Sequence, residues 1–202
     1  MILDRLWRLT RNEYGRAVYE ALARRGVKGS LLYVYARSLH DGDDSDHTPD
    51  GITIDARRKR DLDADISERA FQHLDSTDIV VFARSDGQLL GHVVLSCTRP
   101  VYVAAIETTV GEASNTAYLW RLHVDPAHRQ RGIGTALVAH ARREAARADG
   151  PTTITALVAI DNVPSRTLFE TNGFDRQTLI VYGKAFGWTH KTRWALSDAG
   201  TD

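Results

Sequence analysis

Apolar residues recur at helical spacing at the start of the chain, at Leu3, Trp7, Tyr14, Val18 and Leu22. Gly26 and Gly29 interrupt this pattern, and a second short apolar segment follows at residues 31–39. We therefore predict two helices ahead of the main domain.

The next part of the chain changes from polar sequence to alternating strands. Residues 40–51 are acidic, rich in turn formers and without periodicity, which predicts a solvated loop or linker. Residues 51–56 alternate weakly, as an edge strand does, and residues 63–74 return to helical spacing. Two clear strands, 79–83 and 89–96, flank an Asp86-Gly87 pair, which predicts an antiparallel hairpin.

The last part of the chain alternates between strands and helices. Residues 101–108 predict a further strand or arm, and residues 116–124 a strand that ends at Asp125-Pro126. A helix over 133–148 leads to an apolar, β-branched run at 152–160, and such a crossover places that strand parallel to 116–124. A helix capped by Asp161-Asn162 and a final strand at 177–186 complete the order.

These elements predict a mixed α/β fold. The central sheet is mostly antiparallel with one parallel strand pair, helices flank it, and a helical extension precedes it.

Charge excludes some classes of partner. The 26 basic and 26 acidic residues cancel, so a general nucleic-acid binder or a polybasic membrane protein is not expected. The surplus of basic residues is local, at residues 1–40, where eight Arg and Lys stand against three Asp and Glu. Docking of this segment to nucleic acid or to an anionic membrane stays open as an alternative to packing on its own domain or on a dimer mate.

The single cysteine, Cys97, excludes an internal disulfide and every multi-cysteine metal site, which indicates a reducing compartment. We find neither a bilayer-spanning apolar run nor a secretory signal. We expect a cytoplasmic protein. Arginine outnumbers lysine 22 to 4, which suggests a prokaryotic genome rich in G and C.

One loop carries the clearest chemistry, Arg129-Gln130-Arg131-Gly132-Ile133-Gly134-Thr135, between the 116–124 strand and the following helix. Its glycines allow a sharp turn into the helix, whose unpaired N–H groups and positive dipole end favour a phosphate or pyrophosphate. The loop lacks the Gly-Lys-Ser/Thr of an ATP loop. It also has Leu137 where a dinucleotide fingerprint needs a third glycine or alanine.

The run from His123 to Leu137 resembles the acyl-CoA signature of the GNAT acetyltransferase superfamily, with its Arg-x-x-Gly-x-Gly order. A second stretch, from Asn162 to Phe174, is similar to the GNAT helix that flanks the pantetheine arm. The resemblance implies a GNAT domain over residues 51–190, with residues 1–40 as a helical extension, 41–50 as an acidic linker and 191–202 as a tail.

By this resemblance, acetyl-CoA is the cosubstrate and its acceptor is a primary amine on a small molecule or a protein. The backbone of Leu122, His123 and Val124 is expected to pair with pantetheine. The pyrophosphate is assigned to the loop, that is, to Arg129, Gln130, Arg131, Gly132, Ile133, Gly134 and Thr135. Asn162 and Ser165 are expected to contact the arm, and Phe169 to lie near the thioester sulfur.

The catalytic groups depart from the family pattern. Phe169 stands where the family commonly has a tyrosine, and Tyr118 where several relatives carry a glutamate or histidine base. Candidate catalytic groups are therefore Tyr118, Glu107 and Tyr182, with water as another proton carrier. Strand alternation places Tyr118, Trp120, Leu122 and Val124 on one face, and Leu119, Arg121 and His123 on the other.

The missing acid and base leave a second function open, a non-catalytic module that binds or senses acyl-CoA. No histidine pair with metal-ligand spacing occurs, so no metal is expected. The basic helix residues Arg142, Arg143 and Arg147 are interpreted as a solvated face, and a homodimer remains possible.

Overall fold

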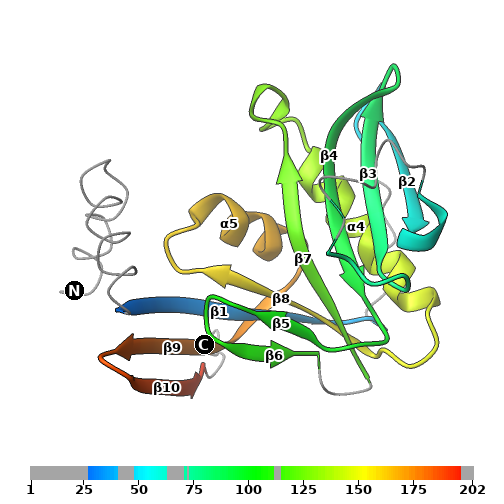
Figure 1. The fold of residues 1–202 in the computed structure, drawn as a ribbon. Coiled ribbons are helices and arrows are strands. Elements are labelled where there is room, and N and C mark those ends of the chain that lie inside the picture. The colour runs from blue at the N-terminus through cyan, green and yellow to red at the C-terminus, as the bar shows by residue number, and fades with distance from the viewer. Residues whose placement is uncertain (1–26, 41–47, 63–70, 72, 112–114, 197–202) are drawn as a thin grey trace, which may run out of the picture.

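The computed structural model describes residues 27–40, 48–62, 71, 73–111 and 115–196. Its main feature is an eight-stranded sheet with the order β10-β9-β1-β8-β7-β4-β3-β2 (Figure 1). The strands are β1 (Lys28–Ser38), β2 (Thr53–Arg58), β3 (Ile79–Ser85), β4 (Gln88–Ser96), β7 (Thr116–Val124), β8 (Thr153–Ala159), β9 (Asp175–Ala185) and β10 (Trp188–Ala195). Within the described residues, β7 and β8 pair in parallel and the other neighbours are antiparallel.

Two helices cover one face of the sheet, called the helix side below. Helix α4 (Ile133–Arg147) packs on β2, β3, β4 and β7, and α5 (Val163–Thr171) packs beside α4. The main apolar core lies between these helices and the sheet, and includes Leu95, Leu119, Leu137 and Ile154, each at most 2% exposed. Short 3₁₀ turns, η2 (Lys59–Asp61) and η3 (Pro126–His128), follow β2 and β7.

A small hairpin covers part of the opposite face, called the arm side below. It consists of β5 (Val101–Val103) and β6 (Thr108–Val110), which pair only with each other. Its connection carries Ile106, which is fully buried against Leu32, Ile180 and Tyr182. The arm therefore closes a second, smaller core over β1 and β9.

Most of the predicted order is confirmed. The Asp86-Gly87 pair has φ of 48° and 79°, as a two-residue hairpin turn requires, and it joins β3 to β4. The parallel pairing of β7 with β8 and the capping of α5 by Asn162 are also confirmed. The predicted first helix and the segments 41–47 and 63–70 lie outside the described residues.

The predicted helix at 31–39 is wrong, because Lys28–Ser38 is a central strand of the sheet. β1 pairs with β8 along one edge and with β9 along the other. A strand that is covered on both faces loses the two-residue alternation, so its apolar run can be mistaken for a buried helix. Its Tyr33, Val34 and Tyr35 are residues that favour strands.

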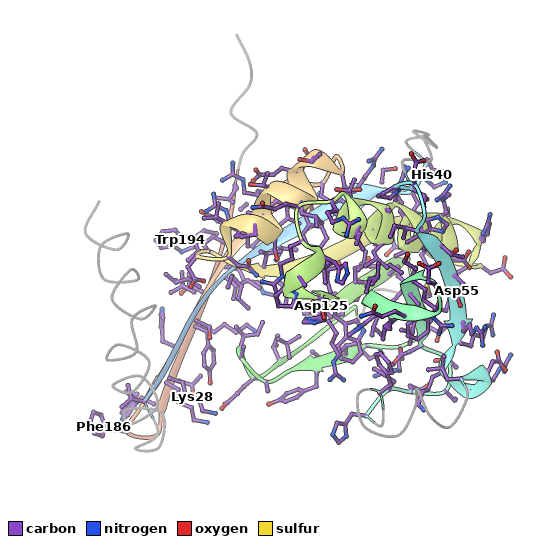
Figure 2. All side chains as sticks on the ribbon, turned by 90° about the horizontal axis from the view of Figure 1, so that it is seen from above. Lys28, His40, Asp55, Asp125, Phe186 and Trp194 are labelled. Carbon is purple, nitrogen blue, oxygen red and sulfur yellow. The ribbon has the colours of Figure 1, made fainter. Side chains whose placement is uncertain are left out.

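The predicted tail from residue 191 is wrong as far as Ala195. Residues 191–195 belong to β10, an edge strand paired with β9 through the turn Phe186-Gly187. Both turn residues have positive φ, 49° and 84°, but phenylalanine is not the usual residue there, so the hairpin signal was weak. Figure 2 shows Lys28 and Phe186 together at the far end of this ribbon, with Asp125 near the centre of the molecule.

The predicted alternation along β7 is wrong after Trp120, because the strand contains a bulge. Trp120 pairs with Val94 but His123 with His92, so β7 has one extra residue in this interval. Arg121, at φ 53°, occupies the bulge. Leu122 and Val124 consequently join the core on the helix side. His123 lies instead on the arm side with Trp120.

Candidate functional site

Strands β7 and β8 separate at the centre of the sheet. Their parallel pairing runs from Thr116 with Thr153 to Leu119 with Ala156 and then stops. Figure 1 shows the two strands diverging beyond this point. Residues 120–124 therefore keep one open edge, whose backbone groups can pair with an extended ligand.

A groove of about 880 Å³ lies beside this open edge. Its walls are the end of β7, the loop into α4, and the start of α5. All the sequence-predicted cofactor residues line it except Arg131 and Phe169, namely Leu122, His123, Val124, Arg129, Gln130, Gly132, Ile133, Gly134, Thr135, Asn162 and Ser165. Two motifs that are separated in sequence thus meet across one groove.

The loop into α4 has the backbone shape of an anion site. Gln130 and Gly132 have φ of 61° and 76°, and Gly132 is the N-cap of the 15-residue helix α4. No side chain caps this end among the described residues, so N–H groups of the first turn face the groove. Together with the helix dipole, these donors favour a phosphate group.

Side chains at the rim of the groove fix its backbone. The Arg129 Nε donates to the Val124 carbonyl oxygen at 3.0 Å, which ties the loop to the end of β7. The Asn162 Oδ1 accepts from the Ser165 N–H at 3.3 Å and caps α5. Both residues therefore have a structural role in addition to the cofactor contact predicted for them.

Two glycines permit close approaches around the groove. A Cβ on Gly91 would lie 2.7 Å from the His123 carbonyl oxygen, at the bulge of β7. A Cβ on Gly134 would lie 2.4 Å from Leu168 Cδ1, where α4 meets α5. The groove thus depends on glycine both at the bulge and at the helix contact.

Some groove residues were missed by the sequence analysis. Thr167, Leu168 and Thr171 line it from one side of α5, and their spacing of three to four residues is the signal that could have identified them. Phe169 instead faces the core, 4% exposed, with its ring 5.9 Å from Tyr35 and 5.1 Å from Phe174. Its predicted place near the thioester sulfur stays a prediction.

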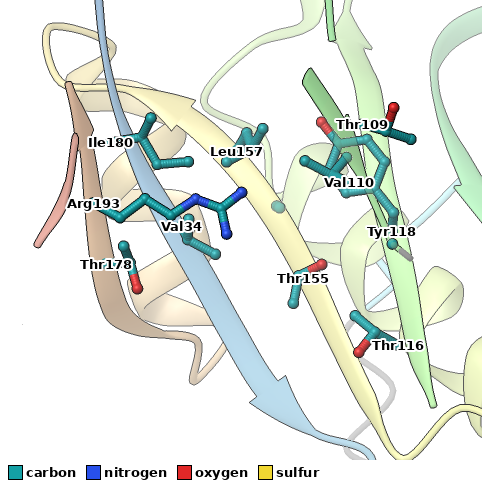
Figure 3. Close-up of a pocket in the computed structure, with 12 residues that line it drawn as sticks. Val34, Thr109, Val110, Thr116, Tyr118, Thr155, Leu157, Thr178, Ile180 and Arg193 are labelled. Atoms are coloured by element: carbon teal, nitrogen blue, oxygen red, sulfur yellow. The ribbon is translucent and has the colours of Figure 1, made fainter. Parts of the chain in front are cut away.

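A second pocket, of about 260 Å³, lies on the arm side of the sheet (Figure 3). Its floor comes from β1, β7, β8 and β9, and β6 and Gly111 form one wall. Tyr118 and Leu157 line it near the point where β7 and β8 separate, and Arg193 reaches it from β10. The groove and this pocket therefore lie on opposite sides of the same separation between strands.

Among the three predicted catalytic residues, only Tyr118 lines the pocket. It is 5% exposed, and burial raises its pKa well above the ordinary value of a phenol. The hydroxyl therefore stays protonated at neutral pH, so Tyr118 can donate a hydrogen bond or a proton but cannot serve as a base.

Glu107 and Tyr182 lie close to each other under the arm, away from the pocket lining. The Glu107 carboxylate accepts hydrogen bonds from Lys184 Nζ at 2.8 and 2.9 Å, and Lys28 Nζ lies 3.6 Å away. The bond with Lys184 holds the pKa of Glu107 below its usual value. Burial and the nearby Glu107 carboxylate raise the pKa of Tyr182.

A buried polar network supports β7 from the arm side. The Ser96 hydroxyl donates to Asp78 Oδ1 at 2.6 Å and accepts from the Trp120 Nε1 at 3.0 Å. Asp78 is fully buried and also pairs with Arg99. The network fixes Trp120 directly before the bulge.

Two histidines lie side by side at the bulge. The rings of His92 and His123 are 5.7 Å apart, and His92 also contacts Phe71 edge to face. Burial lowers the pKa of His92 to about 4, and the charges of His123 and Arg121 add to this effect. His92 is therefore neutral at physiological pH.

The described residues contain no group of three or more His, Cys, Asp or Glu that could hold a metal ion. In the same residues, no helix combines the length and the apolar character needed to cross a bilayer.

Comparison with known proteins shows which family has this sequence pattern and fold. Residues 43–174 match the model of the acetyltransferase (GNAT) family. No curated protein matches the chain.

Solved structures share the fold at low sequence identity. A tandem GNAT protein from the clavulanic acid biosynthesis pathway has a TM-score of 0.57 and 18% identity, over 86% of this chain and 59% of that one. A GCN5-related N-acetyltransferase from Kribbella flavida has a TM-score of 0.55 and 14% identity, over 87% and 74%. A GCN5-related N-acetyltransferase-like protein from Streptococcus suis has a TM-score of 0.54 and 11% identity, over 86% and 68%. The chain thus spans less than two thirds of the tandem protein.

Proposed function

This chain belongs to the GNAT acetyltransferase family, and we propose that it transfers an acetyl group from acetyl-CoA to a primary amine by direct attack in a ternary complex. The observation that carries the proposal is the groove along the open edge of β7, which ends at the uncapped start of α4.

The donor fits this groove from one end to the other. The pyrophosphate binds at the loop, where the N–H groups of residues 130–135 and the Arg129 guanidinium supply donors. The pantetheine arm extends along Leu122–Val124 as an added strand, with Asn162 and Ser165 on its other side. Its thioester then reaches the place where β7 and β8 separate.

The acceptor reaches the thioester from the arm side. Its nitrogen attacks the carbonyl carbon and forms the C–N bond, the C–S bond breaks, and the sulfur takes up a proton as free CoA leaves. The protonated Tyr118 hydroxyl, which lines the pocket, donates to the developing oxyanion or to the leaving thiolate. The nitrogen loses its proton to solvent, because Glu107 is engaged by Lys184.

A specific observation favours a second candidate, a non-catalytic module that binds or senses acyl-CoA. Glu107 and Tyr182 lie outside the pocket lining, and Tyr118 is protonated, so the described pocket lacks a side-chain base.

Binding and turnover distinguish the two candidates. We expect isothermal titration to show CoA binding, and a thiol-release assay with a broad panel of amines to show turnover. Tyr118→Phe should lower kcat by about 100-fold, the lower range for proton-transfer groups, without changing the Kd for CoA. Binding without thiol release from any amine would establish the sensing module instead.

The remaining expectations, a cytoplasmic location, a prokaryotic source and a homodimer, stay predictions. The lone Cys97, which is partly buried, is compatible with a reducing compartment.

A further inference from the structure

The charge of the arm-side pocket is positive. Arg193 is its one charged side chain, and no carboxylate lines it among the residues that the structure describes. The other lining groups are mainly aliphatic side chains and threonine hydroxyls. A volume of about 260 Å³ is below the range of about 300–1,000 Å³ typical of sites for drug-sized ligands, and suits a molecule of amino-acid size.

Arg193 points into this pocket. It lies on β10 opposite Ile180 of β9, so both side chains leave the sheet on the arm side. Figure 3 shows its guanidinium extending past Val34 toward the middle of the pocket. Within the described chain it is engaged by no carboxylate, whereas Arg176 on the helix side pairs with Glu170 at 3.3 Å. A guanidinium is permanently charged and carries donors suited to a carboxylate or phosphate.

The neighbouring charges do not neutralise Arg193. Under the arm, Glu107 is bound by Lys184 and Lys28. Lys191, two residues before Arg193 on β10, lies opposite Tyr182 and donates to the Thr108 hydroxyl. Glu107 therefore does not offset the positive charge of Arg193, and a polycationic acceptor would be repelled.

We infer that the acceptor is a small primary amine that also carries an anionic group, a carboxylate or a phosphate, which Arg193 binds. The inference rests on the proposed acetyl transfer. The anion is held at the β10 side of the pocket, and the amine extends toward Tyr118 and the thioester. The threonines that line the pocket, Thr109, Thr116, Thr155 and Thr178, offer hydroxyl groups along this path.

The test compares acceptors of matched length in the thiol-release assay. Short ω-aminocarboxylates and aminoalkylphosphonates are measured against the corresponding alkylamines and diamines. We expect kcat/KM for the anionic series to exceed that for the alkylamines by about tenfold, as a charge-assisted pair gives, and that for the diamines by more. Preference for one anionic series over the other identifies which anion the pocket takes.

Variants of Arg193 test whether this side chain causes the preference for anionic acceptors. Arg193→Gln should raise KM for the anionic acceptors by about tenfold, and leave kcat/KM for alkylamines and the Kd for CoA unchanged. Arg193→Lys should recover part of the loss. The matched control is Arg176→Gln, which removes an arginine from the helix side and should change none of these values.

Two results would overturn the inference in distinguishable ways. If alkylamines and diamines turn over as well as the anionic amines, or Arg193→Gln affects all acceptors equally, the assignment of the acceptor fails while acetyl transfer stands. If no amine releases thiol although CoA binds, acetyl transfer fails and the inference fails with it.

Discussion

The donor groove and the arm-side pocket are built in different ways. The groove comes largely from two continuous stretches, 122–135 and 162–171, and depends on backbone: positive φ at Gly132, uncapped N–H groups and an open strand edge. The pocket draws on β1, β6, β7, β8, β9 and β10, and depends on side chains such as Tyr118 and Arg193.

The two sites therefore differ in how readily a substitution changes the ligand that they bind. A site made of backbone groups keeps its ligand when most side chains vary, because glycine positions and helix ends define it. A site made of side chains from distant strands changes its ligand with single substitutions. The same fold can therefore keep one donor while the acceptor differs.

The largest effect is expected on the arm side, at Asp78. Asp78→Ala leaves Arg99 and Ser96 without their buried partner, which should lower the free energy of unfolding by about 3 kcal/mol, as removal of one member of a buried pair does. Urea denaturation measures the loss. Because the network lies on the arm side, the Kd for CoA should change less than twofold, by about 0.4 kcal/mol at most.

The matched control is Asp61→Ala, which removes an exposed ion pair with Arg60 at 3.7 Å. It should cost less than about 1 kcal/mol. A similar loss from both substitutions would contradict the assigned role of the buried network.

The second prediction concerns the groove, and the substitution is made at Gly91 of β4. Gly91→Ala would push against the His123 carbonyl oxygen, 2.7 Å from the new Cβ, and lower the free energy of unfolding by about 2 kcal/mol. The edge of β7 moves with the His123 carbonyl, so the Kd for CoA should rise by about tenfold. Asp78→Ala, in contrast, should lower stability and leave the Kd for CoA nearly unchanged. Gly183→Ala is the control, because nothing lies within 4 Å of its Cβ. An unchanged Kd for CoA in a folded Gly91→Ala variant would show that the bulge does not affect CoA binding.

The third prediction concerns pH, at the histidine pair next to the bulge. The pKa of His92 is about 4 in the folded protein against 6.5 in an unfolded chain. The unfolded chain therefore binds a proton between these values that the folded protein does not, and stability falls as pH decreases from 6.5 to 4. After allowance for partial exposure, we expect a loss of about 2 kcal/mol.

His92→Gln should remove this contribution. Between pH 7 and pH 4, the free energy of unfolding of the parent protein should fall by about 2 kcal/mol more than that of the variant. Parallel profiles would show that His92 titrates normally in the folded state.

The sequence predicts residues that the structure brings together along the groove, because their signals are local. The loop at 129–135, the cap at Asn162 and the Asp86-Gly87 turn each depend on a few neighbouring residues, so their local residue patterns predict them. The resemblance to the GNAT family adds the assignment to acyl-CoA. Their physical requirements, positive φ and unpaired N–H groups, restrict the residues that can occupy them.

The arm side could not be predicted because its elements meet only through tertiary pairing. β1 was interpreted as a helix, and β10 as a tail, since neither shows its partner strands in its own pattern. Arg193 was consequently not recognised as a pocket residue. The error at His123 has another cause: an extra residue in a strand leaves no mark in an apolar pattern when arginine occupies it.

The bulge at Arg121 shifts the side-chain alternation along β7 by one residue. Before it, Tyr118 and Trp120 serve the arm side, and after it, Leu122 and Val124 serve the helix side. Deletion of Arg121 would restore a regular alternation and turn neither half over, because Leu119 and Leu122 already face the helix side. It would remove the kink that the extra residue gives the strand, whereas a substitution at Arg121 would keep the extra residue. For protein engineering, the positions to keep are Leu122 and Val124 along the groove, and the lining of the arm-side pocket is the place to vary for new acceptors.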